Sequence, residues 1–138
     1  EELAGGEFQN VIADSKIDAA KATRVILCSG KVYYDLTEHR DAEKIKNTAI
    51  VRIEQFYPLN DDLLKRIYAN YPKAEKIVWC QEEPKNMGAW SFLAPKFMEA
   101  LEIFPTYVGR RESASPAVGS LAKHSVEQAR IVKAAFEI

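Results

Sequence analysis

The sequence has little of what disulfide-bonded, membrane-spanning or nucleic-acid-binding proteins are built from. It contains only two cysteines, Cys28 and Cys80, each at the end of an apolar run and neither in a CxxC pair. Two cysteines are too few for a disulfide framework, so we expect buried free thiols and a reducing compartment. No apolar run could span a bilayer, and no stripe of Lys and Arg marks a nucleic-acid surface.

The first residues lack a targeting signal. The stretch EELAGGEF has no basic head followed by an apolar segment, so we expect no signal peptide in this sequence. It also lacks an initiator Met, which favours a fragment of a longer polypeptide. The chain shows no internal repeat and no low-complexity stretch, so a solenoid is excluded.

What is present has the size and composition of one domain. The chain has 138 residues, 47% of them hydrophobic, and a formal net charge of −1. Residues 1–22 are irregular and predict a linker with a short edge strand near residues 8–12. Residues 23–138 have a regular rhythm and predict the domain itself.

Four short apolar runs alternate with helical patterns after residue 23. The predicted strands are RVILC (24–28), TAIVRIE (48–54), KIVWC (76–80) and PTYVG (105–109). The predicted helices cover 31–46, a segment after Asn60 or Asp61 that ends at Pro72, 89–101, and a last one from a weak capping box at Ser125 and Gln128. Alternating strands and helices imply parallel strands with helical crossovers, so we predict an α/β fold, a three-layer sandwich.

Polar residues gather where each predicted strand ends, which is the layout of a sheet with one functional rim. Ser29, Gly30 and Lys31 follow the first strand. Backbone N–H groups at a helix N-terminus, together with a lysine, can hold an anion. The motif is neither GxxxxGK[ST] nor GxGxxG, and a tight turn that needs glycine is the favoured interpretation.

Two pairs that contain glutamate, Glu54-Gln55 and Glu82-Glu83, end two further predicted strands, which we expect to be neighbours. Paired carboxylates can act as general acid and base, but they can also pair with arginine or stabilise helix N-termini across a subunit contact. The sequence supplies neither an acidic metal cluster nor a nucleophile to complete a catalytic site. We therefore favour structural or interface pairing.

Arg110 and Arg111 stand beside a serine-rich loop, SASPAVGS. Arginine can bind phosphate or carboxylate in bidentate fashion, and a salt bridge to a neighbouring domain is at least as good an interpretation. His39 and His124 have no Cys or second His at ligand spacing, so we expect both to be solvated or locally bonded. Aromatic residues gather near the strand ends, which favours a protein interface with some members in the core: Trp79, Trp90, Tyr33, Tyr34, Phe56 and Tyr57.

The words CSGKVYYDL, AIVRIEQFYP, WCQEEPKNMGAW and GRRESASPAVGS, followed by AKH, occur in this order along nearly the full chain. In these words the chain resembles the C-terminal domain of the thiamine-diphosphate-dependent decarboxylating subunit of 2-oxoglutarate dehydrogenase. The resemblance implies a transketolase C-terminal-like fold, with a mostly parallel five-stranded sheet flanked by helices.

The resemblance also implies the setting in which such a domain works. The whole subunit uses thiamine diphosphate and a divalent metal, Mg²⁺, to decarboxylate 2-oxoglutarate, and it passes the succinyl group to the lipoyl arm of the dihydrolipoyl succinyltransferase component. The cofactor lies between the two preceding domains of a homodimer. The C-terminal domain itself is then expected to be inactive, to bind no cofactor or metal, and to serve assembly in the bacterial cytoplasm or the mitochondrial matrix.

Two alternatives remain open at this point. In actinobacterial relatives the domain contributes to an allosteric acetyl-CoA site, in which a Gln after the second strand is joined by arginines. Gln55 matches that Gln, but Asp61 and Asp62 stand near the arginine positions and would repel a phosphorylated ligand. A small nucleotide- or acetyl-CoA-binding module using Ser29, Lys31 and Arg110 is one alternative. A free-standing enzyme with Cys28 or Cys80 as nucleophile is the other.

Overall fold

The computed structural model of the chain describes residues 10–59, 61–117 and 119–138. Within these residues one sheet contains β1 (Val11–Ile12), β2 (Arg24–Cys28), β3 (Thr48–Ile53), β4 (Lys76–Pro84) and β5 (Thr106–Arg110). The helices are α1 (Val32–Ala42), α2 (Asp61–Ala69), α3 (Trp90–Leu101) and α4 (Leu121–Glu137), with a short 3-10 helix, η2 (Ala19–Lys21). No helix of the described segments has the length and apolar character to cross a membrane.

The sheet has the strand order β1-β3-β2-β4-β5, and its last four strands run parallel. β1 pairs antiparallel with β3 at one edge, with Val11 opposite Ile53. The predicted three-layer α/β sandwich with a mostly parallel five-stranded sheet is therefore confirmed. Part of the predicted N-terminal strand, residues 8 and 9, lies outside the described residues.

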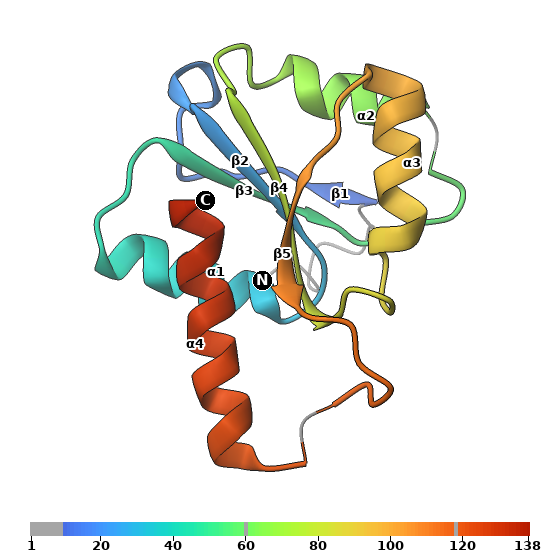
Figure 1. The fold of residues 1–138 in the computed structure, drawn as a ribbon. Coiled ribbons are helices and arrows are strands. Elements are labelled where there is room, and N and C mark those ends of the chain that lie inside the picture. Colours follow the sequence, from blue (N-terminus) through green and yellow to red (C-terminus); the bar gives the residue numbers. More distant parts are fainter. Residues whose placement is uncertain (1–9, 60, 118) are drawn as a thin grey trace, which may run out of the picture.

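The helices cover the sheet from both sides, as Figure 1 shows. α2 and α3 pack on one face, where Leu64, Ile67, Leu93 and Phe97 meet Val25, Leu27, Val51 and Trp79. α1 and α4 pack on the other, where Val32, Leu36, Ile131 and Val132 meet Ile26, Cys28, Ile50, Val78 and Cys80. Because both faces of the central strands are buried, the sequence there is continuously apolar and does not alternate.

A buried ion pair fastens the segment before β2 to the rest of the domain. Arg40 on α1 is 2% exposed and pairs with Asp14, which also accepts the backbone N–H of Ile50 at 2.8 Å. The Arg40 guanidinium lies near the Thr48 carbonyl as well. The sequence predicted only apolar residues for the buried side of this helix, because a buried arginine is recognisable only once its partner is placed.

Two elements differ in extent from their sequence patterns. The last helix begins at Leu121, so Ser125 lies inside it and its Oγ bonds back to the Leu121 carbonyl at 3.1 Å. The predicted capping box is thus wrong, and Gln128 instead donates to Asp35 on α1 at 2.7 Å. β4 continues to Pro84 through residues predicted as loop, because β5 pairs with it past an irregularity between Cys80 and Pro84.

Several residues at apolar helical spacing, which predicts burial, are partly or largely exposed. Tyr68 and Met98 are 39% and 44% exposed, and Ala129 is also exposed. Each lies at the margin of an apolar helical face, and helical spacing alone does not show where the covering layer ends. The first helix ends at Ala42, earlier than predicted, where Lys44 takes a positive φ.

The connections turn to opposite faces at the centre of the sheet. β2 leads into α1, on the α4 face, whereas its neighbour β4 leads into α3, on the α2 face. Strand ends that part in this way leave a crevice at the carboxyl end of a parallel sheet. We call the carboxyl ends of β2 to β5 and the loops that follow them the carboxyl rim.

Glycine substitutions test how the rim is built, because three glycines differ in their surroundings. Gly30 has a φ of +69° but open space around it, whereas a Cβ on Gly109 would lie 2.7 Å from Cζ of Tyr107 and 2.9 Å from the Gln81 carbonyl. Gly119 has neither constraint. We predict that Gly109→Ala costs about 1–3 kcal/mol and Gly30→Ala roughly 1–2 kcal/mol in unfolding free energy, while Gly119→Ala is neutral or slightly stabilising.

Urea unfolding of the three variants gives these free energies directly. A Gly119→Ala variant as unstable as Gly109→Ala would contradict the close approach of β4 and β5 at Gly109.

Candidate functional site

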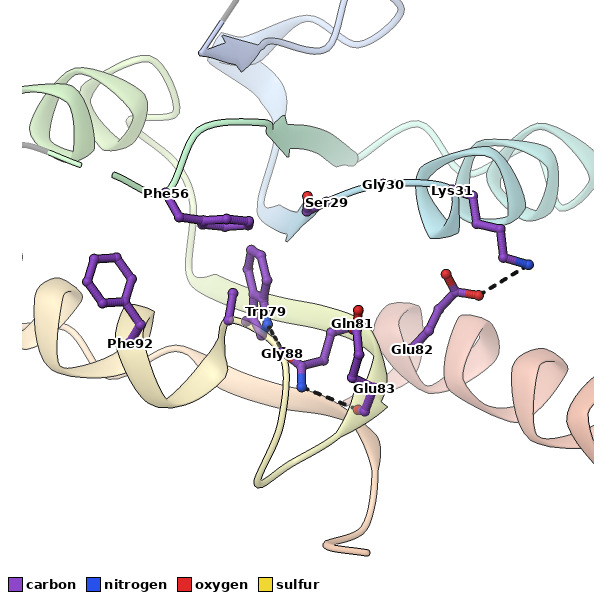
Figure 2. Close-up of a pocket in the computed structure, with 11 residues that line it drawn as sticks. Ser29, Gly30, Lys31, Phe56, Trp79, Gln81, Glu82, Glu83, Gly88 and Phe92 are labelled. Carbon is purple, nitrogen blue, oxygen red and sulfur yellow. Dashed lines mark hydrogen bonds and ion pairs between the residues drawn. The ribbon is translucent and has the colours of Figure 1, made fainter. Parts of the chain in front are cut away.

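A cleft of about 620 Å³ lies at the carboxyl rim, between the ends of β2 and β4. Figure 2 shows its side chains arriving from four parts of the chain: the β2–α1 turn, the loop after β3, the end of β4 and the start of α3. We call it the rim cleft, and its lining residues are Ser29, Gly30, Lys31, Phe56, Trp79, Gln81, Glu82, Glu83, Gly88, Ala89 and Phe92.

The side-chain amide of Gln81 forms the floor of the rim cleft. Gln81 is 3% exposed, and its Oε1 accepts from the Trp79 indole N–H at 2.8 Å and from the Trp90 backbone N–H at 3.1 Å. Its Nε2 donates to the carbonyls of Pro84 at 3.0 Å and Met87 at 2.8 Å. One amide therefore joins β4, the loop after it and the start of α3. The sequence gives no sign of this role, because Gln81 stands at the start of a polar run, directly before Glu82 and Glu83.

One side of the rim cleft is aromatic. Trp79 is 2% exposed, and Phe56 lies edge-on to it with ring centroids 6.1 Å apart. Phe92, on the first turn of α3, is 39% exposed at the opening. Figure 2 shows Phe56, Phe92 and Trp79 gathered on the same side of the cleft, away from Lys31 and Glu82. This part of the cleft can hold apolar or planar groups.

The other side of the rim cleft carries charged side chains, two of which, Lys31 and Glu82, neutralise one another. Lys31 at the start of α1 lies 3.5 Å from the Glu82 carboxylate. Ser29 and Gly30 lie beside them in the turn, where the positive φ of Gly30 confirms the predicted tight turn. An anion at this point would have to compete with Glu82 for Lys31. Glu83 also lines the cleft and is exposed.

A second, smaller hollow of about 180 Å³ lies beyond Glu82 and Glu83, against α4. Arg110 at the end of β5 lines it and pairs with Glu127 of α4 at 3.1 Å, while also donating to the Pro116 carbonyl at 3.0 Å. The Arg110 side chain is only 14% exposed, and its carboxylate partner, Glu127, belongs to this chain. Arg111 is exposed and lines neither hollow.

The end of β3 carries a separate cluster. Arg52, 9% exposed, pairs with Glu54 at 2.9 Å and lies 4.8 Å from the ring centre of Tyr33. Gln55 donates to the Tyr57 carbonyl at 3.0 Å. The sequence predicted that residues 54–55 and 82–83 end neighbouring strands. This prediction is wrong, because β2 lies between β3 and β4.

The two thiols lie on the face of the sheet covered by α1 and α4, and both are fully buried. Burial raises the pKa of the Cys28 thiol and raises the pKa of Cys80 to about 12. A nucleophilic cysteine needs exposure and a depressed pKa, so neither thiol can act as one. The interpretation as plain buried thiols is confirmed, and the cysteine-enzyme alternative loses its nucleophile.

The remaining sequence candidates are dispersed. His39 packs against Phe136 of α4, and His124 lines the smaller hollow. Trp79 and Trp90 belong to the core, whereas Tyr34 and Tyr57 are 60% and 85% exposed. Within the described part of the chain, no group of three or more His, Cys, Asp or Glu residues is arranged to hold a metal ion.

Nearly the whole chain is similar to one family of known proteins. A family model described as 2-oxoglutarate dehydrogenase C-terminal matches residues 1–136. The chain is 46% identical over 138 residues to the 2-oxoglutarate dehydrogenase E1 component of Cupriavidus necator, which covers 98% of this chain and 14% of that protein. It is 41% identical to the E1 component of Azotobacter vinelandii, over 100% of this chain and 15% of the relative. The E1 component of Rickettsia prowazekii is 48% identical over 88% of this chain and 13% of its own length.

Replacing Gln81 with glutamate tests the floor of the rim cleft through its pH dependence. A carboxylate at this position faces the carbonyls of Pro84 and Met87, so burial and repulsion raise its folded-state pKa above the ordinary glutamate value of about 4.3. Stability is then retained at low pH and lost as pH rises through that raised pKa. We predict that Gln81→Glu costs about 1–2 kcal/mol in the acid form and about 3–5 kcal/mol once ionised.

Thermal melts between pH 5 and pH 8 measure this difference against Gln55→Glu, a change at an exposed amide with one hydrogen bond. The same small, pH-independent loss in both variants would show that Gln81 does not hold the loop.

Proposed function

The chain belongs to the 2-oxoglutarate dehydrogenase C-terminal family, and from this we propose that it is the C-terminal domain of a 2-oxoglutarate dehydrogenase E1 component. It spans about 14% of the length of the Cupriavidus necator relative. The whole protein would decarboxylate 2-oxoglutarate in the tricarboxylic acid cycle and pass the succinyl group to the lipoyl arm of the dihydrolipoyl succinyltransferase component. Its compartment would be the bacterial cytoplasm or the mitochondrial matrix.

Within that protein we assign the domain a structural role in assembly. The proposal rests on a contrast at the carboxyl rim. Its buried or pocket-lining cations pair with carboxylates of this chain, whereas an aromatic side chain is exposed to solvent. Lys31 and Arg110 pair with Glu82 and Glu127, whereas Tyr57 is 85% exposed. Exposed aromatic side chains beside a preformed cleft are typical of protein interfaces. The surfaces that cover them would be the preceding domains of the same subunit and the second subunit of a homodimer.

Thiamine diphosphate and Mg²⁺, the cofactors proposed for the whole protein, do not fit the residues of this domain. A diphosphate needs cations or backbone donors that are free to bind it, and the two cations nearest the rim hollows are paired with carboxylates. The described residues also provide no cluster of metal ligands. We therefore propose that the cofactor binds to the rest of the polypeptide, before residues 1–22. Residues 1–22 would lead into the domain at residue 23.

The alternative of a nucleotide- or acetyl-CoA-binding module gains no support from the geometry. Ser29 and Lys31 line the rim cleft, but Arg110 lies in the second hollow and is engaged by Glu127. Asp61 and Asp62 form the exposed first turn of α2, so their charges would oppose a phosphorylated ligand.

Introducing a charge at Tyr57 tests the assembly role in the full-length enzyme. Tyr57 is 85% exposed at the rim, so Tyr57→Asp should leave the fold of the domain intact but place a carboxylate in the contact. We predict a loss of 2-oxoglutarate decarboxylation of about tenfold or more, because interface aromatics contribute roughly 2 kcal/mol or more when removed. Tyr68→Asp is the control, since Tyr68 is exposed on α2 near Val25 and Ile77, at the amino ends of β2 and β4.

Activity and subunit mass are measured for both variants. Wild-type activity and assembly in Tyr57→Asp, or equal losses in the two variants, would contradict a contact at the rim.

A further inference from the structure

We propose that the rim cleft receives a basic side chain, Arg or Lys, from a part of the longer protein outside residues 1–138. The inference rests on the proposed function and adds the chemistry of the partner to it. Three observations carry it: the unbalanced carboxylate in the cleft, the aromatic walls, and the extent of uncovered surface around the opening.

The charge of the cleft calls for a cation. Of its three charged lining residues, Lys31 and Glu82 neutralise one another at 3.5 Å. Glu83 is exposed, and within the described segments no Lys or Arg pairs with its carboxylate. The carbonyl of Glu83 is held by Gln81 and Tyr107, so the residue has a fixed backbone. An unpaired carboxylate on a concave surface favours a positively charged partner over an anionic one.

The aromatic wall suits the stem or the plane of such a side chain. Phe56 and Phe92 lie with Trp79 on the side of the cleft away from Lys31 and Glu82 in Figure 2, and Phe92 is 39% exposed. Arg stacks on aromatic faces, and both Arg and Lys lay their methylene stems along apolar surface while the charged head reaches a polar group. The same cleft thus offers a place for the stem next to Trp79 and a counter-charge at Glu83.

The surroundings favour a protein segment over a small molecule. At about 620 Å³ the cleft has room for a side chain and its neighbours, and the uncovered aromatic surface continues outside it at Tyr57. A small ligand would leave Tyr57 exposed, whereas a polypeptide segment can cover both. Relatives are about seven times longer than the stretch matched here, so they contain ample chain to supply that segment.

A photoreactive benzoylphenylalanine at Phe92 in the full-length enzyme tests this proposal. The substitution keeps an aromatic ring at the opening of the cleft. We expect irradiation to join position 92 to a peptide outside residues 1–138 that carries Arg or Lys within a few residues of the attachment point. The same probe at Met98, 44% exposed on α3 but outside the cleft, should give no such product.

Mass spectrometry of the joined peptides separates the outcomes. An outside peptide without a nearby basic residue overturns the present inference while leaving the rim contact standing. A product confined to residues 1–138, or to a bound small molecule, overturns the inference and the rim contact together. A circular dichroism spectrum and thermal melt like those of the unmodified enzyme, recorded before irradiation, show that the probe-bearing protein is folded.

A charge reversal examines the role of Glu83 separately. Glu83→Lys in the probe-bearing enzyme should lower the yield of the outside product about tenfold, which corresponds to about 1.4 kcal/mol, because an attractive charge pair becomes a repulsive one. Glu99→Lys is the matched control, an exposed position on α3 with a single ion pair to Lys96. An unchanged yield in Glu83→Lys overturns the inference.

Discussion

The side-chain amide of Gln81 holds together the strand, loop and helix from which the rim cleft is built. Its oxygen accepts from the Trp79 indole and from the first N–H of α3, and its nitrogen donates to the carbonyls of Pro84, which ends β4, and of Met87 in the loop that follows. A buried amide with every bond made is rigid, and one with its partners removed is costly. The position of Phe92 and the backbone of Glu83 both depend on this link, so the shape and the charge of the cleft have a common cause.

The sheet topology explains why the cleft lies where it does. β2 and β4 send their helices to opposite faces, which opens the crevice at their carboxyl ends. In this chain the cations beside the crevice are paired with carboxylates, and the two thiols lie in the core. The groups left available for binding at the crevice are aromatic surface and one carboxylate, which suit contact with another protein surface.

The apolar runs of the sequence were enough to predict the layered fold, because strands buried on both faces must be continuously apolar. RVILC and TAIVRI are such runs, and both are strands. Features that depend on a partner elsewhere were not predictable: the end of β4 is fixed by pairing with β5, Arg40 is buried by Asp14, and Arg110 meets Glu127. Sequence patterns brought Ser29, Lys31, Glu82 and Glu83 to one rim correctly, but Gln81, which holds the backbone carbonyl of Glu83, has no periodic signal of its own.

We infer that the carboxyl rim is covered in the intact protein. Hydroxyl-radical footprinting of the full-length enzyme tests this directly, because it measures the solvent accessibility of the rim side chains. Phe92 at the cleft and Tyr68 on α2 are both 39% exposed in the domain, so they form a matched pair. After correction for the intrinsic reactivity of each side chain, the account predicts that Phe92 is modified several times more slowly than Tyr68, with Tyr57 protected as well. Equal modification of Phe92 and Tyr68 would contradict it.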